Sequence, residues 1–192
     1  LVYSSLPGYG QQRTIHVYVA LADNVHQGII PVPARIGNGD DPQNNLYWGC
    51  DEGLKSYFKR SGQWDLLQTF DYRKSKANDV DNSIILERCV FKHINSDDYL
   101  IADAYRGKEI KSAISDFLDS ASGTRKENLY VKVNDQLRKI TIAGDSDLIA
   151  YIGHNGLMDI EIPRFMINEP KKKPVIVLCC LSQKYFGERL EE

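Results

Sequence analysis

The chain has 192 residues, of which 42% are apolar and 26% charged, and its formal net charge is −2. These values are typical of one globular domain and exclude a disordered or collagen-like chain. No stretch approaches the 18 uninterrupted apolar residues of a membrane-spanning helix. Lysine and arginine form no stripe with interleaved aromatic residues, so nucleic acid is not an expected partner. The basic cluster at 171–173 lies between two prolines and predicts a solvated turn.

The chain begins with Leu1, and its four cysteines leave the compartment open. A mature secreted or periplasmic form and a trimmed cytoplasmic form both fit this start. Cys179 and Cys180 are adjacent, which is a poor geometry for a mutual disulfide. The number of cysteines would permit a Cys50–Cys89 disulfide, but nothing else in the sequence supports it. No C-x-x-C pair occurs, so neither a structural zinc site nor another cofactor is expected.

The first third of the chain predicts an arm, a strand, a long loop and a helix. Residues 1–13 are polar and predict an N-terminal arm, and the near-continuous apolar run from Thr14 to Ala22 predicts a strand buried on both faces. Residues 23–45 contain three prolines and a Gly-Asn-Gly-Asp-Asp-Pro run, which predicts either a surface insertion or a loop that serves a site. Apolar residues recur at helical spacing from Leu46 to about Arg60, before Gly62.

The remaining two thirds alternate between strand and helix patterns. Further strands are predicted at 64–72, 84–94, 99–104, 148–153 and 175–179, helices at 108–120 and 183–190, a polar loop at 73–82, and a hairpin of 129–133 with 137–142. Several strands are uniformly apolar, as in a sheet with both faces covered. The sequence therefore predicts one α/β domain, a three-layer sandwich with a mostly parallel central sheet. The strands 14–22, 148–153 and 175–179 are expected to be central parallel neighbours.

In open α/β sheets, functional sites gather beyond the carboxyl ends of the strands. Asp23 and His26 follow the first strand, His154 follows the strand 148–153, and Cys180 follows the strand 175–179. An imidazole that deprotonates a thiol, and a thiolate that attacks a carbonyl, are the two requirements of cysteine-dependent hydrolysis. The loop 23–45 is expected at the same edge of the sheet as His154.

The segments LIAYIGHNG at 148–156 and VIVLCC at 175–180 resemble the histidine and cysteine motifs of the caspase, gingipain and legumain clan of cysteine peptidases. The resemblance implies a caspase-like fold, His154 as general base and Cys180 as nucleophile, with Cys179 in the place of the small residue before it. It also implies a role for Gly156, and its neighbour Asn155, beside substrate and oxyanion. The expected substrate is a peptide or protein.

The chain departs from the clan's pattern at four places. Asn155 stands between His154 and Gly156, and the stretch from His154 to Cys180 is short for the clan. Leu-Ser follows Cys180, and the chain ends 12 residues past that cysteine, whereas clan members continue. These departures leave open a lost tail, a minimal enzyme or an inactive relative.

Two other interpretations stand beside the peptidase. A non-catalytic binding module would use the loop 23–45 and its aromatic neighbours. A metal site of His26, His154, Asp159 and Cys180 is conceivable, although no ligand spacing supports it. His16 and His93 fall within strands and are expected to be structural, and Gly37-Asn38-Gly39 lacks the following Gly-Lys-Ser/Thr of a phosphate loop. Between the two adjacent cysteines, Cys180 is the expected reactive thiol, because it ends the strand and neighbouring side chains point to opposite faces.

Overall fold

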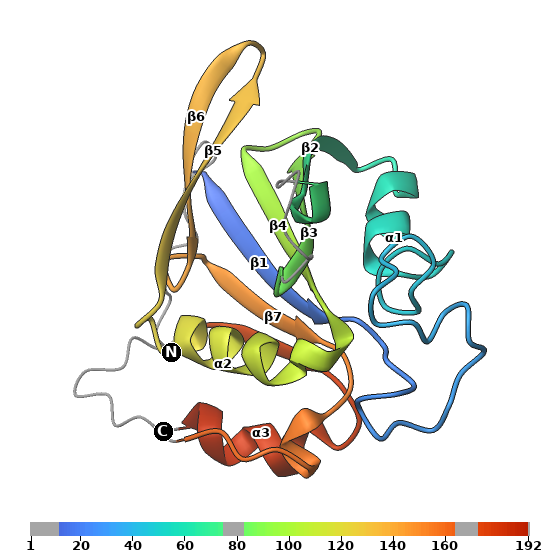
Figure 1. The fold of residues 1–192 in the computed structure, drawn as a ribbon. Helices are drawn as coiled ribbons and strands as arrows, with labels where there is room; N and C mark the ends of the chain where they lie inside the picture. Colours follow the sequence, from blue (N-terminus) through green and yellow to red (C-terminus); the bar gives the residue numbers. More distant parts are fainter. Residues whose placement is uncertain (1–11, 75–82, 164–172, 192) are drawn as a thin grey trace.

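A computed structural model describes residues 12–74, 83–163 and 173–191. The predicted arm up to residue 11, the loop residues 75–82 and the basic residues 171–172 lie outside them. Three helices and eight strands make up the described chain (Figure 1). The helices are α1 (Leu54–Arg60), α2 (Ile110–Ala121) and α3 (Ser182–Glu191). Single 3₁₀ turns are η1 (Tyr72–Lys74), η2 (Gly107–Glu109) and η3 (Gly156–Met158).

Six strands form one mixed sheet in the order β2-β3-β4-β1-β7-β8. Their bounds are β1 Arg13–Ala20, β2 Trp64–Asp71, β3 Ile85–His93, β4 Asp98–Tyr105, β7 Leu148–Ile152 and β8 Val175–Leu178. The strands β4, β1, β7 and β8 run parallel to one another. Strand β3 is antiparallel to both of its neighbours, β2 and β4. The predicted α/β class with a largely parallel sheet is confirmed.

Alternation along β1 builds a core on each face of the sheet. Val17 and Val19 pack on one face against Trp48 and the elements around α1. Tyr18 and Ala20 pack on the other face against α2. Strand β1 is buried on both faces because it lies between two parallel strands and under two layers, as its apolar run predicted.

A second, two-stranded sheet covers part of the α2 face. The strands β5 (Lys126–Val133) and β6 (Gln136–Ala143) are joined by Asn134 and Asp135, whose φ angles of 50° and 61° suit a two-residue hairpin turn. The inward side chains Leu129 and Val131 pack against β3 and β4. The hairpin was therefore predicted correctly and forms part of the layer that contains α2.

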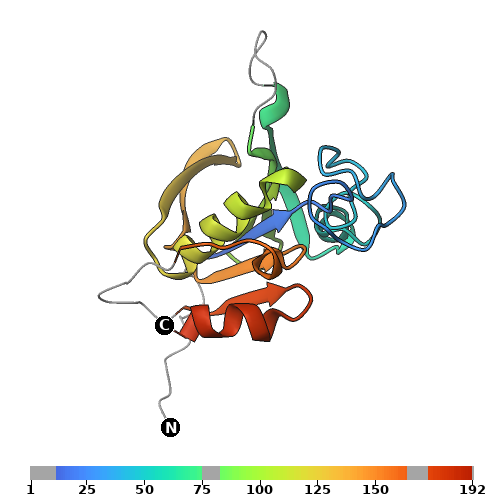
Figure 2. The ribbon, with the colours of Figure 1, turned by 60° about the horizontal axis from the view of Figure 1, so that its bottom comes forward.

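Strand β8 lies at the edge of the sheet, which contradicts the predicted central position. Among the described strands only β7 pairs with it (Figure 2). Val175 and Val177 pack toward α2 and α3, but Ile176 and Leu178 point to the opposite face and are 42% and 58% exposed. The apolar run of this strand predicts burial on both faces. On the face of Ile176 and Leu178, however, α1 and the loop before it cover only the other strands.

The predicted helix from Leu46 to Arg60 is also wrong over its first half. Residues 46–53 form a series of turns, and α1 begins only at Leu54. A Cβ atom on Gly49 would lie 2.2 Å from the Pro42 carbonyl oxygen, so this segment packs directly against the backbone of the preceding loop. The segment is fixed by Trp48, fully buried, whose indole N–H donates to Glu87 Oε2 at 3.1 Å.

All four cysteines are free thiols. The Cys50 thiol donates to the Leu46 carbonyl at 3.0 Å, and Cys89 is buried within β3 beside Thr69. The allowed Cys50–Cys89 bridge is therefore absent from this structure. No helix among the described residues is long and apolar enough to cross a membrane.

Candidate functional site

His154 lies in the loop that directly follows β7, at the carboxyl edge of the parallel strands. Its side chain is only 15% exposed, and its ring Nε2 is buried without a hydrogen-bond partner in the part of the chain that the structure describes. The carbonyl of His154 accepts a hydrogen bond from the Tyr151 hydroxyl at 2.7 Å. Tyr151 is fully buried in the α2-side core, so the core itself holds the backbone of His154 in place.

Cys180 follows β8 and immediately precedes the turn that opens α3. It is the exposed member of the four cysteines. Leu181, the next residue, has a φ angle of 54°, so the chain turns sharply before α3 begins at Ser182. The first turn of α3 lines a hollow of about 430 Å³ together with Leu181. The unpaired N–H groups of a helix N-terminus favour negative charge, which suits a neighbouring thiolate.

Asn155 connects the histidine loop to the cysteine loop. Its side chain is fully buried, and its Nδ2 donates to the Cys180 carbonyl at 2.7 Å. The strands β7 and β8 that precede the two loops are parallel neighbours. The structure therefore places His154 and Cys180 at adjacent strand ends with a partly buried hydrogen bond between their segments. No hydrogen bond joins the His154 ring to the Cys180 thiol among the described residues; such catalytic contacts are often long before substrate binds.

Gly156 has a structural function that the sequence did not reveal. A Cβ atom at this position would lie 2.8 Å from Ile114 Cδ1 of α2, so the glycine allows the loop to pack on that helix. Its N–H donates to the His154 carbonyl at 3.0 Å. The role of this N–H at an oxyanion stays a prediction, and it requires that hydrogen bond to open.

The thiol of Cys179 differs from that of Cys180 in its surroundings. Cys179 packs against the α2-side core, and burial, with the neighbouring Cys180, raises the pKa of its thiol to about 11. Burial, and to a smaller extent Cys180 and Cys179, raise the pKa of Tyr47. Tyr47 belongs to the segment before α1 and packs against the core on the α1 side of the sheet.

The loop 23–45 lies at the same edge of the sheet, as predicted. Gly107, just past β4, donates its N–H to the Gly39 carbonyl at 2.9 Å, and Arg106 forms an ion pair with Asp40. Asn45 bonds both Ala22 and the loop itself, which closes the loop on the end of β1. The carboxyl ends of β4, β1 and β7 therefore share one edge, with the loop packed over the first two.

Asp23 and His26 form a tightly held pair at this edge. The Asp23 carboxylate accepts the backbone N–H groups of Val25 and His26 through Oδ1, and accepts His26 Nδ1–H through Oδ2 at 2.8 Å. Asp23 is buried, whereas half of the His26 side chain is exposed. Their role toward a substrate, expected from the sequence, stays a prediction.

The metal site that the sequence left conceivable has no support in the geometry. The described residues contain no group of three histidine, cysteine, aspartate or glutamate side chains that could hold a metal ion. His154 and Asp159 do lie near each other, with Nε2 3.6 Å from Oδ2, but His26 pairs with Asp23 instead.

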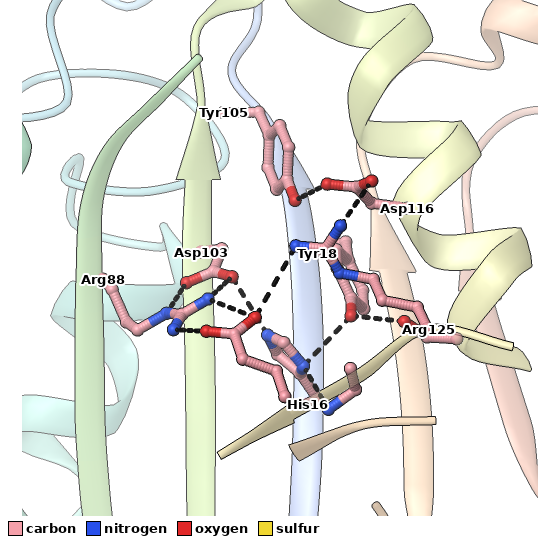
Figure 3. Close-up of polar contacts among 10 residues, drawn as sticks. His16, Tyr18, Arg88, Asp103, Tyr105, Asp116 and Arg125 are labelled. Carbon is pink, nitrogen blue, oxygen red and sulfur yellow. Dashed lines mark hydrogen bonds and ion pairs between the residues drawn. The ribbon is translucent and has the colours of Figure 1, made fainter. Parts of the chain in front are cut away.

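A separate polar cluster lies buried inside the sheet (Figure 3). Arg88 makes two hydrogen bonds to the Asp103 carboxylate, at 2.5 and 2.7 Å, and a further ion pair with Glu127. His16 Nδ1 accepts the backbone N–H of Ala143, so the opposite Nε2–H donates to Asp103 at 3.0 Å. The His16 ring and the Asp103 carboxylate are buried, and Glu127 comes from strand β5 of the hairpin. His16 is therefore structural, as predicted, and it fixes β6 to β1.

Arg88 dominates the electrostatics of this cluster. Burial alone would raise the pKa of Asp103, but the charge and hydrogen bonds of Arg88, assisted by His16, hold that pKa well below its usual range. Burial raises the pKa of Tyr105, whose hydroxyl donates to Asp116 on α2 at 2.6 Å. These groups bond one another rather than facing solvent, which favours a structural role.

A hollow of about 840 Å³ lies away from His154 and Cys180. It opens between α2 and the start of β3, and its walls include Lys111, Asp116 and Arg125. Tyr72 and Ser83 also line it. His154 and Cys180 do not line this hollow, so it does not coincide with the residues at the strand ends.

Comparison with known proteins yields no match: no protein-family profile fits the chain, and neither a curated protein nor a solved structure is significantly similar. The Asn155–Cys180 hydrogen bond had no sequence signal, although Asn155 itself was expected beside substrate and oxyanion as the neighbour of Gly156. This hydrogen bond joins segments 25 residues apart in the chain, so local patterns do not report it.

Proposed function

We propose that this chain is a cysteine peptidase-like hydrolase that cleaves a peptide or amide bond with Cys180 and His154. The observation that carries the proposal is the partly buried Asn155–Cys180 hydrogen bond of 2.7 Å, which joins the histidine loop to the cysteine loop. The parallel neighbours β4, β1, β7 and β8, with the two motifs after the last two strands, support the caspase-like interpretation. The edge position of β8 counts against it, because a central position was expected.

The exposure of the cysteines supports the choice of nucleophile. Cys180 is exposed, Cys89 is buried with a thiol pKa raised to about 12 by burial, and Cys179 is half-buried with its pKa raised to about 11. A thiolate is the reactive form of cysteine. At neutral pH the thiols of Cys89 and Cys179 stay protonated, and the partly buried Cys50 thiol donates to the Leu46 carbonyl. Cys180 is therefore the most accessible candidate, beside the first turn of α3.

The reaction follows from the two side chains. His154 accepts the thiol proton, and the Cys180 sulfur attacks the carbonyl carbon of the scissile bond. The tetrahedral oxyanion collapses, the C–N bond breaks, and the imidazolium returns the proton to the leaving amine. Water, deprotonated by the same imidazole, then hydrolyses the thioester and regenerates the free thiol. N–H groups at the start of α3 are candidates for stabilising the oxyanion.

Limited alkylation tests the proposal. The intact protein is treated with a small excess of iodoacetamide near neutral pH, and modification of each cysteine is followed by peptide mass spectrometry. Cys180 should react first, and His154→Ala should slow its reaction. His93→Gln is the matched control, because His93 ends β3 next to Ser96, away from β7 and β8. Equal rates at Cys50, Cys89 and Cys180, or reaction of Cys180 only after denaturation, would overturn the proposal.

The alternative is a non-catalytic caspase-like binding module, and one observation favours it. Val25 and Ile30 are 80% and 90% exposed on the loop 23–45, although Asn24 ties that loop together by two hydrogen bonds to the Val32 backbone. Exposed apolar side chains on an ordered loop suit contact with a partner. A Cys180 whose alkylation does not depend on His154 would favour this module.

A further inference from the structure

The charged side chain of Asp159 lies beside Nε2 of the His154 ring. The Asp159 carboxylate oxygen Oδ2 lies 3.6 Å from Nε2, which is buried and otherwise without a hydrogen-bond partner among the described residues. A buried ring nitrogen without a partner is costly, so such an atom calls for an explanation. A shift of well under 1 Å would bring this pair to ordinary hydrogen-bond distance.

The turn η3 holds Asp159 in front of the imidazole. The N–H groups of Asp159 and Ile160 both donate to the Gly156 carbonyl, at 3.1 and 2.8 Å, and the Gly156 N–H donates to the His154 carbonyl. These bonds fold the chain back on itself directly after the histidine. The Asp159 side chain is 67% exposed, so it can move toward Nε2 without disturbing the core.

We propose that Asp159 is a positioning residue that accepts Nε2–H of His154 and leaves Nδ1 to take the Cys180 proton. This inference rests on the proposed function. The carboxylate fixes the tautomer and the orientation of the imidazole, and it balances the charge of the imidazolium that forms when the thiol is deprotonated. The carboxylate itself stays unprotonated throughout.

The direction of the effect separates positioning from a simple charge effect. An aspartate that acts only through its negative charge disfavours a nearby thiolate, so its removal would speed alkylation of Cys180. An aspartate that orients and stabilises the imidazolium favours the thiolate, so its removal slows alkylation. The two roles therefore predict rate changes of opposite sign.

The experiment measures the rate of Cys180 alkylation by iodoacetamide against pH in the intact protein. Asp159→Asn should slow alkylation about two- to fivefold near neutral pH, the range of an exposed charge pair, and raise the pH of half-maximal rate. Asp159→Glu should restore part of the rate. Glu161→Gln is the control, because it removes the same charge from an exposed residue of the same segment.

Combination with His154→Ala tests whether Asp159 acts through the histidine. Asp159→Asn should have no further effect in the His154→Ala background, whereas a direct charge effect on Cys180 would persist. Unchanged or faster alkylation in Asp159→Asn, with His154→Ala still slow, overturns this inference and leaves the proposed function standing. Alkylation that His154→Ala does not slow overturns the proposed function itself.

Discussion

Replacing Arg88 by methionine should strongly destabilise the protein, because it isolates a buried carboxylate. Arg88 and Asp103 are 4% and 1% exposed, and the guanidinium supplies two hydrogen bonds to the carboxylate. In Arg88→Met, Asp103 keeps only the His16 hydrogen bond. Removing one partner of a buried ion pair costs about 3–5 kcal/mol. With a urea dependence of about 2 kcal/mol per molar, the unfolding midpoint should fall by about 2 M.

The pH dependence of the loss has a definite sign. In the wild type the pKa of Asp103 is held low, so its contribution to stability is present above the unfolded value of about 3.9 and is lost as the pH falls below it. In Arg88→Met, burial raises the pKa above the unfolded value, so the penalty is present at neutral pH and is relieved on acidification. The difference between the two proteins should therefore shrink below about pH 5.

The assay is urea unfolding followed by circular dichroism at several pH values, with Asp103→Asn as the second arm of a double-mutant cycle. The double variant lacks the buried charge, so it should be at least about 2 kcal/mol more stable than Arg88→Met at neutral pH. If the double variant is no more stable than Arg88→Met, or if the loss is independent of pH, the isolated carboxylate does not explain the effect.

Two further predictions concern the site and the edge strand. Asn155→Asp removes the N–H donor and places a carboxylate against the Cys180 carbonyl. It should lower the unfolding free energy by about 1–3 kcal/mol and slow Cys180 alkylation. Unchanged stability and alkylation would show that this hydrogen bond does not hold the loops together. Leu178→Lys should change the unfolding free energy by less than about 0.5 kcal/mol, because Leu178 is exposed. Val177→Lys should lower the unfolding free energy several-fold more, because Val177 packs on the core side. Equal losses in thermal unfolding would contradict the position of β8.

Local patterns were sufficient where one element's own residues decide its structure. The apolar run of β1 predicted a strand buried on both faces, and Asn134-Asp135 predicted the hairpin turn, because backbone preference at φ > 0 is a property of the residues themselves. The positions of His154 and Cys180 after two apolar strands likewise predicted that they would share one edge, since parallel strands end on the same side of a sheet.

Only the tertiary structure decided which faces are covered and which polar groups meet. The sequence of β8 is as apolar as that of a central strand, but burial depends on the layers above it, and α1 does not extend over Ile176 and Leu178. The helical spacing from Leu46 was overridden because Trp48 bonds to Glu87 on β3, remote in the sequence. Hydrogen bonds between distant segments depend on how the chain is arranged in space, which no local pattern records.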